Sequence, residues 1–134
     1  MRTYFVDTWY LIARFEILDG HHRRALAIDR RTVAAEFVTH DGVLTEFLTY
    51  FADSGPLGRQ GVVAFVRAFM RRATVLPADR ELFLAALARY ERRGDKQYSL
   101  TDCMSMVVME QYGITHVLTN DHHFRQEGFT LVNE

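Results

Sequence analysis

The sequence has one cysteine, two prolines and one lysine, and it contains no long uninterrupted apolar run. Cys103 has no second thiol with which to form a disulfide or a thiolate zinc site, so we expect it to be a buried, inert side chain. No segment approaches the length of a membrane span, and Asp7 interrupts the apolar residues at the start of the chain. These absences, together with the lack of low-complexity runs and internal repeats, predict a folded cytoplasmic protein without a membrane anchor.

Length and charge limit the class of protein further. A chain of 134 residues is long enough to bury a core, and we expect a single domain over residues 1–134. The net charge of −1 argues against a general nucleic-acid binder, because phosphate contacts need a basic surface. However, 15 of the 16 basic residues are arginine, whose planar guanidinium binds two phosphate oxygens at once. Four arginine pairs occur, at 23–24, 30–31, 71–72 and 92–93. Any single pair is more typical of a solvated helix face than of an RNA contact.

Hydrophobic periodicity and turn residues predict alternating strands and helices. The expected strands are residues 2–6, 36–39, 73–76, 114–118 and 129–132, and the expected helices are residues 8–18, 21–35, 43–52, 59–72, 77–92 and 100–112. Asp41 is placed to cap the helix at 43–52. Residues 54–58 are expected to form a loop, since their glycines match no phosphate-binding pattern. The alternation predicts an α/β protein with a central, mainly parallel sheet covered on both faces, a three-layer α/β/α fold.

Four acidic residues are expected at one edge of this sheet. Asp7 and Asp121 follow predicted strands, whereas Glu46 and Asp102 fall in the first turns of predicted helices. Open parallel sheets bind ligands at the carboxyl ends of their strands, where the strand order reverses. Converging carboxylates repel one another unless a cation neutralises them, and oxygen ligands favour Mg²⁺ or Mn²⁺ over zinc. For Asp102 alone, the spacing from Ser99 is also typical of a helix capping box.

Four short segments carry these acids. They are Phe5-Val6-Asp7-Thr8, Leu44-Thr45-Glu46, Ser99-Leu100-Thr101-Asp102-Cys103 and Leu118-Thr119-Asn120-Asp121-His122-His123-Phe124. In this order and spacing, which span nearly the whole chain, they resemble the PIN-domain nucleases, most closely the VapC toxins of VapBC-type toxin-antitoxin pairs. The resemblance implies a Rossmann-like PIN fold and a metal-dependent endoribonuclease that hydrolyses RNA phosphodiester bonds. It also implies a homodimer and neutralisation by a small antitoxin protein.

The resemblance assigns roles to individual residues. It implies that Asp7, Glu46, Asp102 and Asp121 hold Mg²⁺ or Mn²⁺ and carry catalysis, with Thr119 in a supporting position. When these four acids are set aside as a metal site, the rest of the chain carries a net charge of +3. Metal-assisted attack of water on phosphorus does not need the RNA 2′-hydroxyl. The products are therefore expected to carry 5′-phosphates rather than 2′,3′-cyclic phosphates.

Aromatic residues near the motifs have two interpretations. Trp9 stands where the family commonly has a small polar residue, which leaves the hydrogen bonding around the first acid open. Trp9, Tyr10 and Tyr98 could stack on RNA bases, although most aromatic side chains must fill the core.

Other polar residues near the motifs are also ambiguous. Asp95 could supply a further carboxylate, but the more typical role is that of a solvated turn residue. His122 and His123 could bind metal or transfer protons, but we expect both to be solvated, because histidines in a turn after a strand are commonly exposed.

Two other folds with a leading Asp fit poorly. A phosphatase of the haloacid-dehalogenase type needs a second Asp two residues later, where this chain has Trp9, and a receiver domain needs a lysine after a late strand, whereas Lys96 precedes the Asp102 helix. Two alternatives remain open, namely a catalytically silent PIN fold that binds RNA or protein and a housekeeping RNA-processing nuclease without an antitoxin. The four intact carboxylates favour a nuclease over the silent module, which would gain nothing from their mutual repulsion.

Overall fold

Five parallel strands form the centre of the computed structural model, which describes residues 1–134. They are β1 (Thr3–Val6), β2 (Glu36–His40), β3 (Thr74–Leu76), β4 (His116–Leu118) and β5 (Thr130–Val132), in the spatial order β3-β2-β1-β4-β5. The chain runs outward from β1 through β2 and β3, and then returns to place β4 on the other side of β1. This reversal makes the carboxyl ends of β1 and β4 the expected ligand position in an open parallel sheet.

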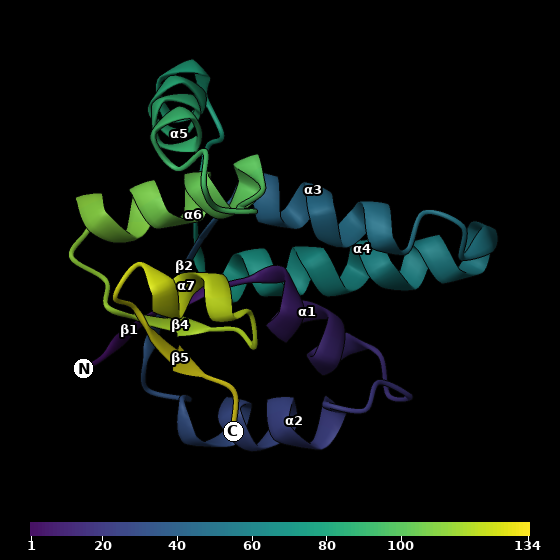
Figure 1. The fold of residues 1–134 in the computed structure, drawn as a ribbon. Coiled ribbons are helices and arrows are strands. Elements are labelled where there is room, and N and C mark those ends of the chain that lie inside the picture. The colour runs from purple at the N-terminus through teal and green to yellow at the C-terminus, as the bar shows by residue number, and fades with distance from the viewer.

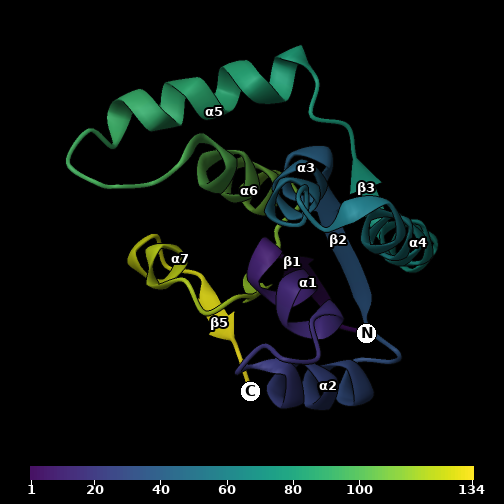
Figure 2. The ribbon, with the colours of Figure 1, turned by 90° about the vertical axis from the view of Figure 1, so that its right-hand side faces the viewer.

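Seven helices surround the sheet (Figures 1 and 2). They are α1 (Thr8–Phe15), α2 (His22–Arg31), α3 (Asp41–Tyr50), α4 (Gly55–Arg72), α5 (Arg80–Arg92), α6 (Leu100–Gln111) and α7 (His122–Gln126). In both views α2 lies on one side of the strands and α6 on the other, with α5 outside α6. The predicted three-layer α/β/α fold with a parallel sheet is therefore confirmed. None of the helices combines the length and the apolar character needed to cross a membrane.

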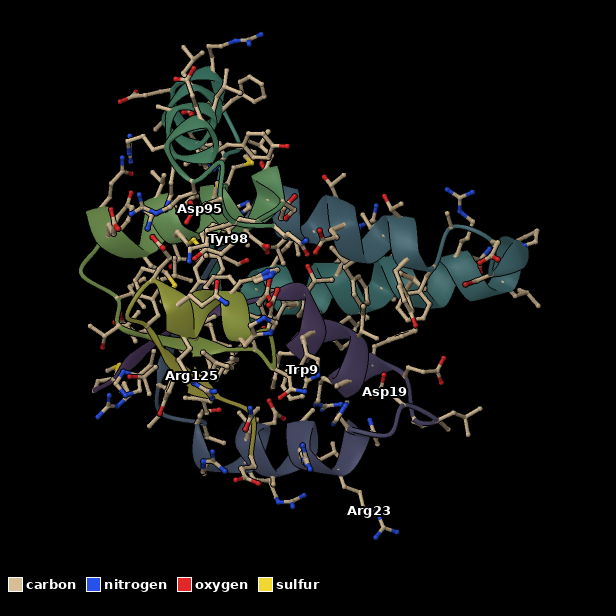
Figure 3. The ribbon with its side chains drawn as sticks, in the orientation of Figure 1. Trp9, Asp19, Arg23, Asp95, Tyr98 and Arg125 are labelled. Carbon is tan, nitrogen blue, oxygen red and sulfur yellow. The ribbon has the colours of Figure 1, made fainter.

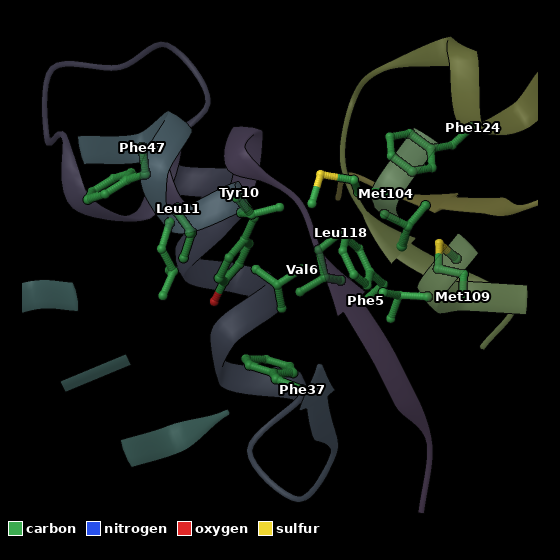
Figure 4. Close-up of a cluster of buried hydrophobic side chains, with 14 of the residues drawn as sticks. Phe5, Val6, Tyr10, Leu11, Phe37, Phe47, Met104, Met109, Leu118 and Phe124 are labelled. Atoms are coloured by element: carbon green, nitrogen blue, oxygen red, sulfur yellow. The ribbon is translucent and has the colours of Figure 1, made fainter. Parts of the chain in front are cut away.

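The core is one cluster of 28 buried apolar residues. Phe5 and Val6 of β1 are fully buried, because the central strand of a parallel sheet is covered on both faces. Figure 4 shows them beside Leu118 of β4, with Met109 of α6 close by. Residues 103–109 of α6 are all buried. This confirms the central position predicted for that helix and the buried thiol of its cysteine.

Some element boundaries differ from the prediction. Residues 54–58 are not a loop, because α4 already begins at Gly55. Pro56 fits the first turn of a helix, where the missing N–H would have no helical partner. α1 ends at Phe15, which leaves Leu18 exposed instead of extending the apolar face. The five-residue α7 was not predicted at all.

Candidate metal centre

Asp7 lies at the carboxyl end of β1, at the N-cap position of α1, and is 7% exposed. Its side chain makes no cap hydrogen bond; its Oδ2 instead accepts a hydrogen bond from the buried Thr119 hydroxyl at 2.7 Å. Burial raises the pKa of Asp7 from 3.8 to about 7; the Thr119 hydrogen bond opposes this rise, and the charges of Asp102 and Glu46 add to it. The protein by itself therefore does not fully stabilise the ionised carboxylate.

Glu46 reaches the same edge from α3, one turn later than predicted. α3 begins at Asp41, so Glu46 lies in its second turn rather than its first. The helix starts early because His40, not Asp41, is its N-cap, with the imidazole Nδ1 accepting the Gly42 N–H at 3.0 Å. Glu46 is exposed, and its Oε1 accepts a 2.5 Å hydrogen bond from the Thr8 hydroxyl. This bond joins the start of α1 to α3.

Asp102 is the third residue of α6, where it caps the helix and also faces the other acids. It forms the predicted capping box with Ser99: the Ser99 Oγ accepts the Asp102 N–H at 3.0 Å, and the Asp102 Oδ2 accepts the Ser99 N–H at 3.1 Å. The Asp102 side chain is nevertheless only 15% exposed and faces the other acids. Burial raises its pKa, the Ser99 hydrogen bond opposes the rise, and the charge of Asp121 adds to it. The capping box therefore fixes Asp102 beside the acidic cluster.

Asp121 is the N-cap of α7, and its Oδ1 accepts the His123 N–H at 2.9 Å. The His123 Nδ1 lies 3.2 Å from the Asp121 Oδ1 and 3.5 Å from the Asp102 Oδ2. These three residues each offer a ligand atom, all within 4.8 Å of one another. The prediction that His123 is solvated is wrong, since its side chain is only 21% exposed, whereas His122 is exposed as expected.

A sequence signal for His123 does exist. An Asp at an N-cap commonly binds the N–H of the second or third helical residue. The pattern Asp121-x-His123 therefore places the imidazole beside the carboxylate, provided that a helix begins at residue 122. The signal was missed because α7, with five residues, is too short to show helical periodicity.

A buried ion network lies next to the His123 ring. Glu127, just after α7, accepts hydrogen bonds from Arg89 at 2.6 Å, from Arg93 at 3.2 Å and from the Tyr98 hydroxyl at 2.9 Å. Burial alone would raise the pKa of Glu127, but these hydrogen bonds hold it below its ordinary value. The Tyr98 ring packs edge-on against His123, with ring centroids 5.2 Å apart. The network therefore connects Arg89 of α5, through Glu127 and Tyr98, to the ring of His123 and helps to fix the orientation of that ring.

The residues left ambiguous by the sequence have different positions. Tyr10 and Tyr98 are buried, so the interpretation that they stack on bases is wrong. Trp9 extends from α1 (Figure 3) and is half-buried. Its ring centroid lies 5.5 Å from that of His21. Asp95 lies on the exposed connection between α5 and α6, as expected for a turn residue, and does not join the acidic cluster.

The four acids lie at one edge, and the ligand atoms of two of them, Asp102 and Asp121, group with that of His123 within 4.8 Å. The charges of Asp102 and Glu46 raise the pKa of Asp7, and the charges of Asp121 and Glu46 raise the pKa of Asp102. They converge from the end of β1, from α3, from α6 and from the β4–α7 connection, which is the predicted edge. Carboxylate oxygens with one imidazole nitrogen suit a divalent cation, which would remove the repulsion.

Comparison with known proteins gives one family match and several structural matches. The sequence matches the PIN domain family over residues 4–129, and no curated protein matches it. Among solved structures it is similar to VapC20 of Mycobacterium tuberculosis, a sarcin-ricin loop cleaving toxin, with 26% identity, a TM-score of 0.82, and coverage of 97% of this chain and 98% of that one.

Two further solved structures are less similar. DNA-bound VapBC from Salmonella typhimurium has a TM-score of 0.67 at 19% identity and covers 98% of this chain and 97% of that one. FitAcB from Neisseria gonorrhoeae has a TM-score of 0.67 at 16% identity and covers 96% of each chain. At these identities the likeness shows the fold alone.

Proposed function

The chain belongs to the PIN-domain family, and from that premise we propose that it is a metal-dependent endoribonuclease and the toxin of a VapBC-type pair. The observation that carries the proposal is the position of Asp7, Glu46, Asp102 and Asp121 at the carboxyl edge of the sheet, where the charges of neighbouring acids add to the raised pKa values of Asp7 and Asp102. Similarity to a VapC toxin over nearly the full length of both chains supports it. A catalytically silent module is less consistent with this site, because it would retain the repulsion between the carboxylates without a function for them.

We propose that these four acids hold Mg²⁺ or Mn²⁺. The raised pKa values of Asp7 and Asp102 indicate carboxylates whose charge the protein alone leaves under-compensated, which is the condition that a bound cation corrects. Each of three acids has one oxygen fixed by a neighbouring donor. The acid and donor pairs are Asp7 with Thr119, Glu46 with Thr8, and Asp102 with the Ser99 N–H.

The reaction is proposed to be hydrolysis of the RNA phosphodiester. When bound, the metal would supply a Lewis acid for the phosphoryl oxygen and lower the pKa of the attacking water. The chain holds the carboxylates in fixed orientations at one edge and buries Asp7 almost completely, so water is largely excluded behind the site. Fixed carboxylates in a partly dry site reduce the reorganisation that the reaction requires.

We infer that the substrate is a structured RNA loop of the sarcin-ricin type, which VapC20 is named for cleaving. Loops present unstacked bases that proteins recognise by stacking and by shape. Trp9 lies two residues after Asp7 and is half-buried, and we propose that the exposed part of its ring stacks on a base. Arg23, which Figure 3 shows extending away from α2, is one of several exposed arginines available for phosphate.

We also propose that the chain forms a homodimer and binds a small antitoxin. Solved structures of the same fold include VapBC and FitAcB, whose names indicate assemblies of two components. The outer face of α5 exposes Leu84, Leu87 and Tyr90, each about half accessible, which gives an apolar surface available for a protein partner. A housekeeping nuclease would have the same active site but no antitoxin.

The test is cleavage of ribosomal RNA and of a sarcin-ricin loop oligonucleotide by the purified protein. We expect cleavage with Mg²⁺ or Mn²⁺, none with EDTA, and fragments with 5′-phosphate ends. Asp102→Asn should lower the cleavage rate by at least about 100-fold, because it removes one charged ligand from a shared site.

Asp95→Asn is the matched control, since Asp95 is an exposed acid outside the cluster, and it should cleave like the wild type. Metal-independent cleavage, cyclic-phosphate ends, or equal cleavage by wild type and Asp102→Asn would contradict the proposal. Cleavage of unrelated single-stranded RNA at the same rate would retain the nuclease but reject the structured-loop substrate.

A further inference from the structure

The His123 ring faces the acidic cluster without a hydrogen bond at its Nδ1 atom. This nitrogen is buried and unpaired, although the Asp121 Oδ1 and the Asp102 Oδ2 lie 3.2 and 3.5 Å away. An unpaired buried polar atom is unfavourable, and each such atom in a fold needs an explanation. The position of Nδ1 beside two carboxylate oxygens indicates a shared third partner.

The spacing of these three atoms fits a metal ion. In octahedral coordination with ligands about 2.1 Å from the ion, adjacent ligand atoms are about 3 Å apart. The two distances from the His123 Nδ1 are close to this value. The ligand atoms of Asp102, Asp121 and His123 also all lie within 4.8 Å of one another. One ion can therefore contact all three without a large movement of the chain.

The imidazole is held in this orientation from several sides. The His123 backbone N–H is bound by the Asp121 carboxylate, and the ring packs against Tyr98, whose hydroxyl is fixed by Glu127. The next residue, Phe124, is fully buried and anchors α7 in the core. A ring fixed in this way loses little conformational freedom when it binds an ion.

We propose that His123 is a metal ligand through Nδ1, together with Asp102 and Asp121, and that it makes the site select transition-metal ions such as Mn²⁺ over Mg²⁺. Imidazole nitrogen suits first-row transition metals, whereas Mg²⁺ prefers an all-oxygen site. The inference rests on the proposed function, because it requires that the acidic cluster binds a metal. It adds a nitrogen ligand that the four acids alone do not provide.

The direct test is electron spin-echo spectroscopy of Mn²⁺ bound to the purified full chain, which detects a coordinated imidazole nitrogen. We expect the nitrogen signal in the wild type and in His122→Gln, and its loss in His123→Gln. His122 is the matched control, because it is the adjacent histidine and is exposed.

Metal titrations by calorimetry extend the test. His123→Gln should raise the Kd for Mn²⁺ by about tenfold or more and that for Co²⁺ by a larger factor, while the Kd for Mg²⁺ changes little. His122→Gln should leave all three constants unchanged.

The outcomes separate the inference from the proposed function. Mn²⁺ bound to the wild type without a nitrogen signal overturns the inference and leaves the nuclease proposal standing. Tighter Mn²⁺ binding by His123→Gln also overturns it, since the imidazole would then substitute for the cation. A wild type that binds no metal at all overturns both. If His123→Gln does not fold, a nitrogen signal that persists in His122→Gln still assigns the ligand to His123, and loss of the signal in His122→Gln overturns the inference.

Discussion

At the residue scale, Asp7 destabilises the metal-free fold. Its pKa of about 7 in the folded protein, compared with 3.8 ordinarily, means that ionisation is less favourable in the fold than in the unfolded chain. The destabilisation is absent below about pH 4, where both states are protonated, and reaches its full size above about pH 7. This difference corresponds to roughly 4 kcal/mol at most. A buried residue that lowers the stability of the fold is typical of a functional site.

We therefore expect Asp7→Asn to increase the free energy of unfolding of the metal-free protein by roughly 2 to 4 kcal/mol at pH 8. The amide keeps the volume and can still accept the Thr119 hydrogen bond, but it carries no charge. Urea unfolding in EDTA measures the effect, which should shrink at pH 5. Asp95→Asn, with an exposed carboxylate, should change stability by less than about 0.5 kcal/mol. Lower stability of Asp7→Asn at pH 8 would contradict the raised pKa.

At the element scale, His40 connects a strand to two helices that carry acids. It ends β2, caps α3 by accepting the Gly42 N–H, and donates from Nε2 to the Ser105 Oγ of α6 at 2.9 Å. Ser105 in turn donates to the Thr101 carbonyl. Burial lowers the pKa of His40 from 6.5 to about 4, so the ring is neutral at pH 7. These hydrogen bonds hold α3, which carries Glu46, against the start of α6.

We expect His40→Asn to be less stable than the wild type by about 1 to 3 kcal/mol at pH 7.5. Asparagine can still cap α3 but is too short to reach Ser105, and it leaves a cavity. The wild-type advantage should be complete above about pH 6.5 and should be lost as the pH falls toward 4, because burial lowers the pKa of His40 and protonation places a charge on the buried ring. Protonation also removes the acceptor for the Gly42 N–H.

Urea unfolding of both proteins between pH 7.5 and 4.5 measures this difference. Asp7 is present in both proteins, so its own pH dependence cancels in the comparison. His122→Asn, which changes an exposed imidazole, should show no such trend. A gap between wild type and His40→Asn that stays constant with pH would show that burial does not lower the pKa of His40 in the fold.

Much of the element order was predictable, because strand and helix periodicities are local properties of the sequence. The strands, the parallel sheet and three of the four acid positions were predicted in that way. Glu46 was misplaced by a turn because the cap of α3 is a buried imidazole, and no sequence preference indicates that a histidine will act as an acceptor. His123 was misjudged because α7 is too short to show helical periodicity, and because its second contact, with Asp102, depends on α6 and α7 meeting in space. Long-range polar contacts of this kind leave no local pattern.

At the scale of the whole molecule, the arginines that looked like RNA contacts are divided between two roles. In three pairs the second member is engaged within the fold: Arg31 with the Glu134 carbonyl, Arg72 with the Phe37 ring, and Arg93 with Glu127. Their partners Arg30, Arg71 and Arg92 are exposed. One member of each of these three pairs therefore stabilises the fold, and the other remains available for phosphate. The net charge of −1 thus understates the basic surface, because four acids are gathered at one edge.

The residues at the carboxyl edge of the sheet come from positions 7 to 123 of the chain. A ligand that binds them therefore stabilises the entire chain against unfolding. We expect Mn²⁺ at about 100 times its Kd to add roughly 2.7 kcal/mol to the free energy of unfolding, which corresponds to an increase in Tm of roughly 10 °C. Asp102→Asn should show almost no increase, although its amide oxygen can still accept the Ser99 N–H and keep the capping box.

Thermal unfolding with and without Mn²⁺, followed by circular dichroism, measures this stabilisation, and Asp95→Asn should retain it in full. Equal stabilisation of wild type and Asp102→Asn would place the metal elsewhere, and no stabilisation of either would favour a silent module. The experiment detects metal binding through the stability of the fold rather than through RNA cleavage. It therefore distinguishes two cases that a failed cleavage assay cannot distinguish. One is a nuclease that binds metal but whose RNA substrate is missing from the assay, and the other is a PIN fold that has lost its metal site.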